Sequence, residues 1–247
     1  MRPAFLALAL MTTMGWLISP RATAQDNPSP VMVPQAQQFD VHSKSGLDYR
    51  IFVAAPPGPP PAEGSPVVYL SDGNSNFPIV LAAARRVSRE APPVVVVGIG
   101  YPSDDPAVQQ DRRSFDLTPA LAPGATLTRP GPGAASQPPP RSGGDDAFLA
   151  FIEEELKPII EQKYKIDRTR QTLFGHSFGS LFVLHTLFSK PEAFQNYVAS
   201  SPSIWWNDGS IRAEADAFVE KLRERPVTAR VLISVGEWEQ KPPANVS

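Results

Sequence analysis

Cysteine is absent from the 247-residue chain, so disulfides and thiolate chemistry are excluded. An excess of positive charge is absent too, since 23 Lys and Arg residues stand against 25 Asp and Glu residues. A chain with this balance has no basic field to attract nucleic acid or an anionic membrane surface, and neither is expected as a partner. Histidine is scarce, with three in the chain, which limits the side chains available as a general base.

Long hydrophobic runs are absent except at the N-terminus. There, residues 4–18 are apolar, follow Arg2 and precede Ala-Thr-Ala at residues 22–24. As a helix this run would span about 22 Å, less than the roughly 30 Å hydrocarbon core of a bilayer. The pattern predicts a secretory signal peptide over residues 1–24 rather than a stable membrane anchor, and therefore a periplasmic or secreted protein.

Proline, by contrast, is abundant, with 29 residues in the chain. That is more than twice the average usage of about 5%. Many of these prolines lie between residues 102 and 144, where hydrophobic periodicity is weak. We expect this segment to be a Pro/Gly-rich lid or loop insertion.

Elsewhere, apolar β-branched runs alternate with helical patterns. Strands are expected at 49–55, 66–71, 93–99, 172–175, 197–200 and 230–236, and helices at 76–90, 178–189 and 211–224. A further helix should start at Asp145 and be kinked by Pro158, and residues 25–37 should form a flexible lead-in. Continuous apolar runs suit strands buried on both faces of a sheet. The sequence predicts one α/β domain over residues 25–247, with a mostly parallel, doubly wound sheet.

One motif carries chemistry, the Gly-His-Ser-Phe-Gly of residues 175–179. It lies between an expected strand and an expected helix, where a nucleophile elbow needs a sharp turn with glycines. Ser177 is therefore the predicted nucleophile, and the backbone N–H of Phe178 is one predicted oxyanion donor. The second donor is expected from Gly73 or Asn74, in the turn after an early strand. The alternatives are an ordinary serine in a glycine-rich turn and a plain Asx turn.

Several longer strings resemble a known family. They are YLSDGN, VGIGYP, RRSFDLTP, FLAFIEEELKPIIEQKY, TLFGHSFGSLFVLHTLF, YVASSPSIWW and ISVGEWEQ. Together they are similar to the esterase branch of the α/β hydrolases, and within it to the siderophore-esterase (trilactone hydrolase) type, over roughly residues 36–240. The resemblance implies an α/β-hydrolase fold, hydrolysis of a small-molecule ester without cofactor or metal, and periplasmic or secreted action. Ser177 matches the nucleophile of this family, whereas Ser180 stands where its elbow usually has a second glycine.

The acid of a catalytic triad follows the nucleophile in the chain order of this fold. Glu237 is the predicted acid because it comes directly after the expected strand at 230–236. Glu239 and Asp208 are alternatives, and each of these carboxylates has a plain surface role as its competing interpretation.

The histidine of a triad is missing from its expected place downstream of Ser177. His176 adjoins the nucleophile and is expected to point away from it and to pack. His185 lies about 12 Å further along the helix, which is too far for a hydrogen bond, and should be a core histidine with a satisfied partner. His42 precedes the first clear strand and is expected at the surface. A serine without a base is a weak nucleophile, so activity is expected to be low or lost.

Two further features bear on the substrate. Trp205 and Trp206 follow the expected strand at 197–200, at the sheet edge where α/β folds bind ligands, and could stack on an aromatic group or cover the core. Arg113 could hold an anionic substrate or pair with a neighbouring acid such as Asp111 or Asp116.

Two functions from different classes remain open, an exported serine esterase and a noncatalytic protein that keeps the pocket. The chain ends shortly after Gly236, before any final helix, strand and histidine loop, so a C-terminally truncated hydrolase with an exposed edge strand is expected. Nothing in the sequence indicates the oligomeric state or the identity of the ester.

Overall fold

The computed structural model describes residues 32–88, 91–124 and 139–239. The chain divides into residues 1–32 and the unit Val33–Ser247, which carries the fold. The predicted signal peptide at residues 1–24 lies outside the described residues. Within the described ranges, none of the helices has the length and apolar character required to span a bilayer.

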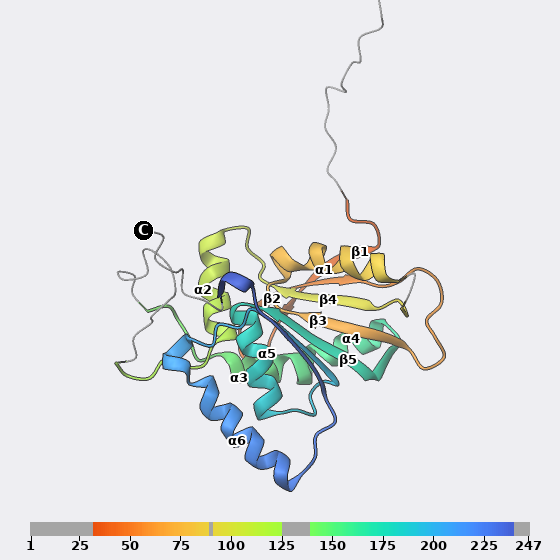
Figure 1. Cartoon of the computed structure of the whole chain (residues 1–247). Coiled ribbons are helices and arrows are strands. Elements are labelled where there is room, and N and C mark those ends of the chain that lie inside the picture. The colour runs from red at the N-terminus through yellow and green to blue at the C-terminus, as the bar shows by residue number, and fades with distance from the viewer. Residues whose placement is uncertain (1–31, 89–90, 125–138, 240–247) are drawn as a thin grey trace, which may run out of the picture. The chain divides into compact units, whose positions relative to one another are not determined.

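The described strands form one sheet with the order β1-β2-β4-β3-β5-β6-β7 (Figure 1). They are β1 (Ala36–His42), β2 (Asp48–Ala54), β3 (Ser65–Leu70), β4 (Val95–Gly100), β5 (Ile166–His176), β6 (Asn196–Ser200) and β7 (Arg230–Ser234). β2 pairs antiparallel with β1 and β4, whereas all neighbouring pairs from β4 to β7 are parallel. The predicted mostly parallel sheet is therefore confirmed.

Helices lie on both faces of this sheet, as the doubly wound prediction requires (Figure 1). The α-helices are α1 (Gly73–Val87), α2 (Pro106–Leu117), α3 (Asp145–Phe151), α4 (Lys157–Lys163), α5 (Phe178–Ser189) and α6 (Ile211–Glu224). Short turns of other helix types are η2 (Ile152–Leu156), η3 (Trp206–Gly209) and η4 (Glu237–Glu239). α5 and α6 begin and end where the sequence predicts.

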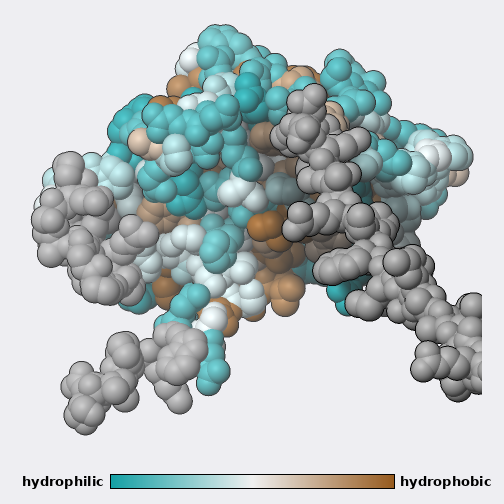
Figure 2. Space-filling model, turned by 90° about the horizontal axis from the view of Figure 1, so that it is seen from above, coloured by the Kyte–Doolittle hydropathy of each residue, from teal (hydrophilic) through white to brown (hydrophobic). Residues whose placement is uncertain are grey.

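The hydrophobic core is split by the sheet into two unequal parts. The smaller part packs Phe77 and Leu81 of α1 against Leu70 and Val96. The larger part joins the other face of the sheet to α3 and α5, and ten residues of α5 are buried. The surface seen in Figure 2 is mainly hydrophilic, with apolar residues limited to small patches. The sheet centre is thus covered on both sides, which suits the continuous apolar runs of its strands.

The structure differs from the sequence predictions in the Pro-rich segment 102–144. Residues 125–138 lie outside the described residues, but α2 occupies Pro106–Leu117. Asp105 caps this helix by accepting from the Ala107 N–H, and Pro106 occupies its first turn, where a missing N–H has no cost. The prolines here bound a helix instead of preventing one.

A further difference concerns the N-terminal edge of the sheet. β1 was not predicted, and it starts at Ala36, inside the expected lead-in. It alternates weakly because it is a half-exposed edge strand, paired with β2 over its whole length. The helix that starts at Asp145 changes to the π-helical turn η2 before α4, whose first turn holds Pro158. The kink expected at Pro158 stays a prediction.

Candidate active site

The Gly-His-Ser-Phe-Gly motif forms the turn between β5 and α5. Ser177 has φ 57° and ψ −116°, a conformation that non-glycine residues rarely adopt and that costs about 1–3 kcal/mol. Its N–H donates to the Ser200 carbonyl oxygen at 3.1 Å, and its own carbonyl accepts from the N–H groups of Ser180 and Leu181. The strained residue is therefore anchored to both β6 and the first turn of α5.

The flanking glycines are required by close backbone contacts. A Cβ at Gly175 would overlap the carbonyl oxygen of Gly179, and a Cβ at Gly179 would overlap the Ser71 hydroxyl. Ser180, in place of a second glycine, is fully buried, and its Oγ has no hydrogen-bond partner among the described residues. This strand-turn-helix geometry is the one that a nucleophile elbow needs.

The predicted oxyanion donors lie at the starts of two helices. Phe178 is the first residue of α5, and Gly73 and Asn74 are the first two residues of α1. The first N–H groups of a helix have no intrahelical acceptor, so they can donate to a ligand. β3 and β5 are parallel neighbours, with Leu70 opposite Phe174, and the two turns leave the same edge of the sheet.

The side chain of Asn74 has a separate structural role. Its Oδ1 accepts from the Tyr101 N–H at 2.7 Å, and its Nδ2 donates to the Tyr101 carbonyl at 3.0 Å. These bonds fix the end of β4 to the turn after β3. Any oxyanion contact by this residue therefore has to come from its backbone.

Arg113 of α2 joins the two turns. Its Nε and Nη2 donate to the two carboxylate oxygens of Asp72 at 2.8 and 3.0 Å. Its guanidinium carbon also lies 5.1 Å from the centre of the Phe178 ring. The neighbouring acids weighed for it have other partners, since Asp111 pairs with Arg141 and Asp116 with Arg112.

A pocket of about 270 Å³ opens beside these turns. Arg113 and His176 both line it, together with Asp72, Asn74, Ser75, Asn76, Tyr101, Gln109 and Gln110. The side chain of His176 is exposed, so the expectation that it packs is wrong. His176 is the last residue of β5, opposite Ser200 of β6, and its side chain lines the pocket instead of packing in the core.

None of the three histidines, all of which are described, is hydrogen-bonded to Ser177. His42 lies at the surface and contacts Asp48 at 2.7 Å. His185 is buried and contacts Glu214 at 2.8 Å, as expected of a histidine with satisfied partners. Burial alone would lower the pKa of His185, but Glu214 and the nearby aspartates outweigh it and raise the pKa to about 9.

The side chain that does contact the Ser177 hydroxyl is Ser203, at 3.2 Å between the two Oγ atoms. Ser203 is buried, and its N–H donates to the Ser177 carbonyl at 3.3 Å. Sequence reasoning gave this residue no role. Its position in Ser-Pro-Ser, after the carboxyl end of β6, could have indicated the contact with Ser177, because the elbow lies at the same edge of the sheet.

The two predicted substrate-binding tryptophans differ in burial. Trp206 is 1% exposed, and its Nε1 donates to the Pro119 carbonyl at 3.0 Å, so it covers the core. Trp205 is half-buried, with its ring centre 5.9 Å from that of Phe178. Of the pair, only Trp205 presents surface beside the elbow.

The predicted triad acid Glu237 and its alternative Glu239 lie in η4, and the alternative Asp208 lies in η3. Glu237 is exposed and forms no hydrogen bond or ion pair with another described residue. Glu239 accepts a hydrogen bond from the Ser201 hydroxyl at 2.9 Å, in the loop that also carries Ser203. Asp208 is exposed in η3. The structure thus brings the alternative Glu239, rather than Glu237, to the loop beside Ser177.

α2 also carries a buried carboxylate, that of Asp116. Burial raises the pKa of Asp116 to about 6, against the opposing effect of Arg112 beside it. The Arg112 guanidinium lies over the rings of Tyr49 and Tyr101, at 5.1 and 5.0 Å from their centres. This group of side chains attaches α2 to the sheet.

The fold and the elbow together define the class of the α/β hydrolases. The family model described as "Putative esterase" matches residues 43–246. The chain belongs to this esterase family.

Curated relatives agree with that assignment. The chain is 43% identical to the "Ferri-bacillibactin esterase BesA" of Bacillus subtilis (strain 168) over 197 residues, which cover 78% of this chain and 66% of BesA. It is 38% identical to the "Siderophore triacetylfusarinine C esterase" of Aspergillus fumigatus over 230 residues, 88% of this chain and 73% of that protein. These relatives are siderophore esterases by name.

Solved structures give the same result. The BES protein from Bacillus cereus superposes with a TM-score of 0.74 at 36% identity, covering 87% of this chain and 79% of that chain. The siderophore hydrolase EstB from Aspergillus nidulans gives a TM-score of 0.70 at 34% identity, with coverages of 87% and 74%. The α/β-hydrolase fold predicted from the sequence is confirmed.

Proposed function

We propose that the protein hydrolyses carboxylic esters of the siderophore type through an acyl-enzyme on Ser177. The observation that carries this proposal is the elbow itself, with a strained Ser177 between β5 and α5. The siderophore esterases among the relatives support the substrate class.

In this reaction the Ser177 Oγ attacks the ester carbonyl carbon, and the carbonyl oxygen becomes an oxyanion. The N–H of Phe178, with that of Gly73 or Asn74, stabilises the oxyanion. Collapse of the intermediate expels the alcohol and leaves the acyl group on Ser177. Water then releases the acid and regenerates the serine.

The hydroxyl proton of Ser177 has no histidine to receive it. Ser203 lies within hydrogen-bond distance of Ser177, but a hydroxyl is a poor base at neutral pH. The proton then passes to solvent hydroxide or to the leaving alcohol through water. We therefore expect slow hydrolysis, several orders of magnitude below that of a complete triad.

The lack of a histidine hydrogen-bonded to Ser177 also favours a second function, the binding of a ligand without catalysis. A protein with the pocket but no histidine at Ser177 could bind the ester or its product without turnover. In that case Arg113, Trp205 and the pocket beside His176 would contact the ligand.

Hydrolysis of p-nitrophenyl esters by the full chain separates the two functions. The esterase proposal expects release of p-nitrophenol above the rate of the Ser177→Ala variant. Ser88→Ala is the matched control, because Ser88 is an exposed hydroxyl at the end of α1 that bonds only the Arg85 carbonyl. Equal rates for the wild type and Ser177→Ala would overturn the esterase proposal and favour ligand binding.

The substrate class needs a separate assay. Ferri-bacillibactin and triacetylfusarinine C, the compounds in the names of the two curated relatives, are incubated with the chain, and the hydrolysis products are separated by chromatography. Cleavage of either, lost in Ser177→Ala, supports the siderophore class. Hydrolysis of p-nitrophenyl esters without cleavage of either siderophore would contradict the substrate class and leave the esterase chemistry intact.

We also propose that the protein acts in the periplasm or outside the cell, on the basis of the signal-peptide pattern at residues 1–24. N-terminal sequencing of the exported protein should begin at Gln25. Retention of the full N-terminus on protein recovered from the cytoplasmic fraction would contradict this localisation.

A further inference from the structure

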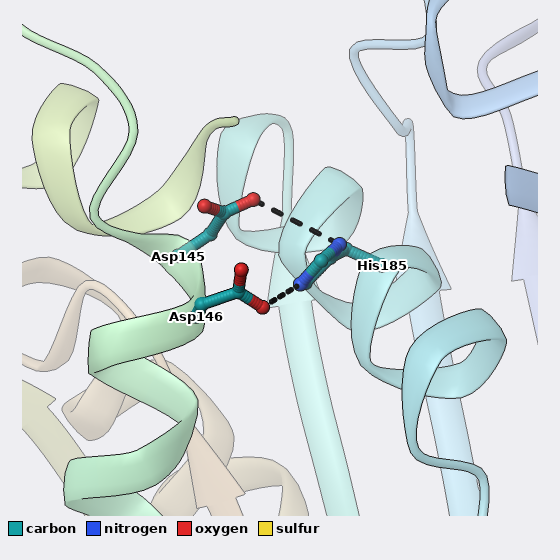
Figure 3. A group of neighbouring side chains, drawn as sticks. All are labelled: Asp145, Asp146 and His185. Atoms are coloured by element: carbon teal, nitrogen blue, oxygen red, sulfur yellow. Dashed lines mark hydrogen bonds and ion pairs between the residues drawn. The ribbon is translucent and has the colours of Figure 1, made fainter. Parts of the chain in front are cut away.

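A histidine and three carboxylates meet where α3, α5 and α6 pack together. His185 of α5 is 8% exposed and faces Asp145 and Asp146, which are both on α3 (Figure 3). Its Nε2 is 3.1 Å from Asp146 Oδ1, and its Nδ1 is 3.8 Å from Asp145 Oδ2. Glu214 of α6 is hydrogen-bonded to Nδ1 at 2.8 Å.

The negative charge of this cluster exceeds its positive charge. A protonated His185 can balance only one of the three carboxylates. Among the described residues, no Lys or Arg forms an ion pair with Asp145, Asp146 or Glu214. Two negative charges are left over at a site where Asp145 is buried, Glu214 is half-buried and Asp146 is open to solvent, and the buried part of this charge favours a cation.

One oxygen of the cluster is also unsatisfied. Asp145 is 5% exposed, and its Oδ2 has no hydrogen-bond partner among the described residues although it points toward the histidine (Figure 3). A buried carboxylate oxygen without a partner is costly, because its hydration is lost and nothing replaces it. This orphaned oxygen is independent of the charge excess and indicates a ligand at the same place.

We propose that Asp145, Asp146 and His185 bind a divalent transition-metal ion, with Zn²⁺ as the fitting member of that class. One donor atom from each residue lies within 4.8 Å of the other two. Ligand atoms around a tetrahedral Zn²⁺ lie about 3.4 Å apart, so small side-chain rotations close the site. One imidazole with carboxylates suits zinc better than magnesium, which prefers oxygen ligands and retained water.

Glu214 takes the supporting role in this site. When Nε2 binds the metal beside Asp146 Oδ1, Nδ1 carries the proton and donates it to Glu214 Oε2. Asp145 Oδ2, which lies 3.8 Å from Nδ1, then has to turn toward the ion. A carboxylate behind a metal-bound imidazole fixes its tautomer and orientation. Binding displaces the proton from Nε2 to solvent, and water fills the remaining position of the metal.

The metal would act as a clamp and not as a catalyst. His185 follows Ser177 by eight residues, about 12 Å along α5. The ion would tie the start of α3 and the helix α6 to α5. Asp146 is 87% exposed in its side chain and gives the ion a path from solvent.

Zinc titration of the full chain, after treatment with EDTA, tests the site at neutral pH in a buffer that does not bind metal. We expect one Zn²⁺ per wild-type chain by calorimetry or competition with a chromophoric chelator. His185→Gln should remove that binding, and Asp146→Asn should weaken it by at least about tenfold. Zinc should also raise the melting temperature of the wild type more than that of Asp146→Asn.

His42→Gln is the matched control. His42 contacts Asp48 at 2.7 Å but is exposed and has a single carboxylate neighbour. The His42→Gln variant should therefore bind zinc with the same affinity and stoichiometry as the wild type. His185→Gln removes a buried group and the variant can fail to fold. In that case the test rests on Asp146→Asn, which changes an exposed side chain. Absence of zinc binding by the wild type, or equal affinity for the wild type and Asp146→Asn, would overturn the proposal.

Discussion

The centre of the parallel sheet and its β7 edge are built from similar apolar strands, but they differ in burial. In the centre, Tyr69 of β3 and Leu173 of β5 are at most 1% exposed. In β7, every residue is exposed, and Leu232 and Ile233 reach 61% and 55%. The exposed apolar edge that the sequence predicts is present.

The difference in burial between the sheet centre and β7 separates the residues of the candidate site into two groups. Ser177, Phe178 and Gly73 stand on turns that leave the covered centre, where packing fixes the backbone. Glu237 and Glu239 follow the exposed β7, where little packing restrains them. We infer that the turns carrying the predicted nucleophile and the predicted oxyanion donors are rigid features of the fold, whereas the turn carrying the predicted acid is not.

The largest expected effect compares one leucine from each region. Leu173→Ala should reduce the free energy of unfolding by about 3 kcal/mol, because it opens a cavity in the core. Leu232→Ala should change it by less than about 0.5 kcal/mol, since that side chain is exposed. Urea denaturation measures both. Equal losses for the two variants would show that β7 is packed as firmly as the centre.

A glycine substitution tests the rigidity of the elbow. In Gly175→Ala the new Cβ meets the backbone of Gly179, which cannot rotate away, so we expect a loss of about 3 kcal/mol. Gly46→Ala is the control, because its Cβ has open space and only its positive φ is unfavourable, at about 1 kcal/mol. A loss at Gly175 no greater than that at Gly46 would contradict a tightly packed elbow.

The pH dependence of the free energy of unfolding tests the burial of the Asp116 carboxyl group. Its pKa is raised to about 6 in the folded protein, from 3.8, mainly by burial. The folded state therefore holds this proton more tightly than the unfolded state, and its contribution to stability is lost as pH rises from about 4 through 6. Relative to Asp116→Asn, the wild type should lose about 2 kcal/mol over that range.

Denaturation of both proteins at several pH values measures this difference. Asp111→Asn is the comparison, because Asp111 lies on the same helix but its side chain is 44% exposed. A constant difference between the wild type and Asp116→Asn across the range would show that Asp116 titrates normally.

The smallest expected effect concerns Arg113, which joins the turns at Asp72 and Phe178. Arg113→Met keeps most of the side-chain volume but leaves the Asp72 carboxylate, 10% exposed, without its partner. We expect a loss of about 1–2 kcal/mol in the free energy of unfolding. Arg141→Met removes an exposed ion pair with Asp111 and should cost less than about 0.5 kcal/mol. Equal losses of unfolding free energy in Arg113→Met and Arg141→Met would show that Arg113 does not hold the turns at Asp72 and Phe178 together.

Local patterns were enough to predict α5, α6 and the elbow. The apolar run from Phe178 to Ser189 and the glycines around Ser177 carry their own signals, since core burial and sharp turns demand those residue types. By contrast, β1 and α2 are half-exposed and polar, and their stability comes from partners elsewhere in the chain. A single-sequence pattern cannot show such partners.

Contacts between distant segments were equally out of reach. Arg113 pairs with Asp72 across 41 positions, and Glu239 reaches Ser201 across 38. The sequence offered nearer acids for Arg113 and gave no reason to prefer Glu239 over Glu237. Only the packing of α2 on the elbow, and of η4 beside the loop after β6, selects these pairs.

Ser177 is proposed as a nucleophile that acts without a base from any of the chain's three histidines. Phosphonylation of the full chain by a fluorophosphonate, followed by intact mass and peptide mapping, tests it over a range from about pH 6 to pH 9. We predict modification at Ser177, with a rate that rises about tenfold per pH unit because hydroxide takes the proton. Modification at another residue, or a rate that levels off above about pH 7 as a histidine base would give, would contradict the claim.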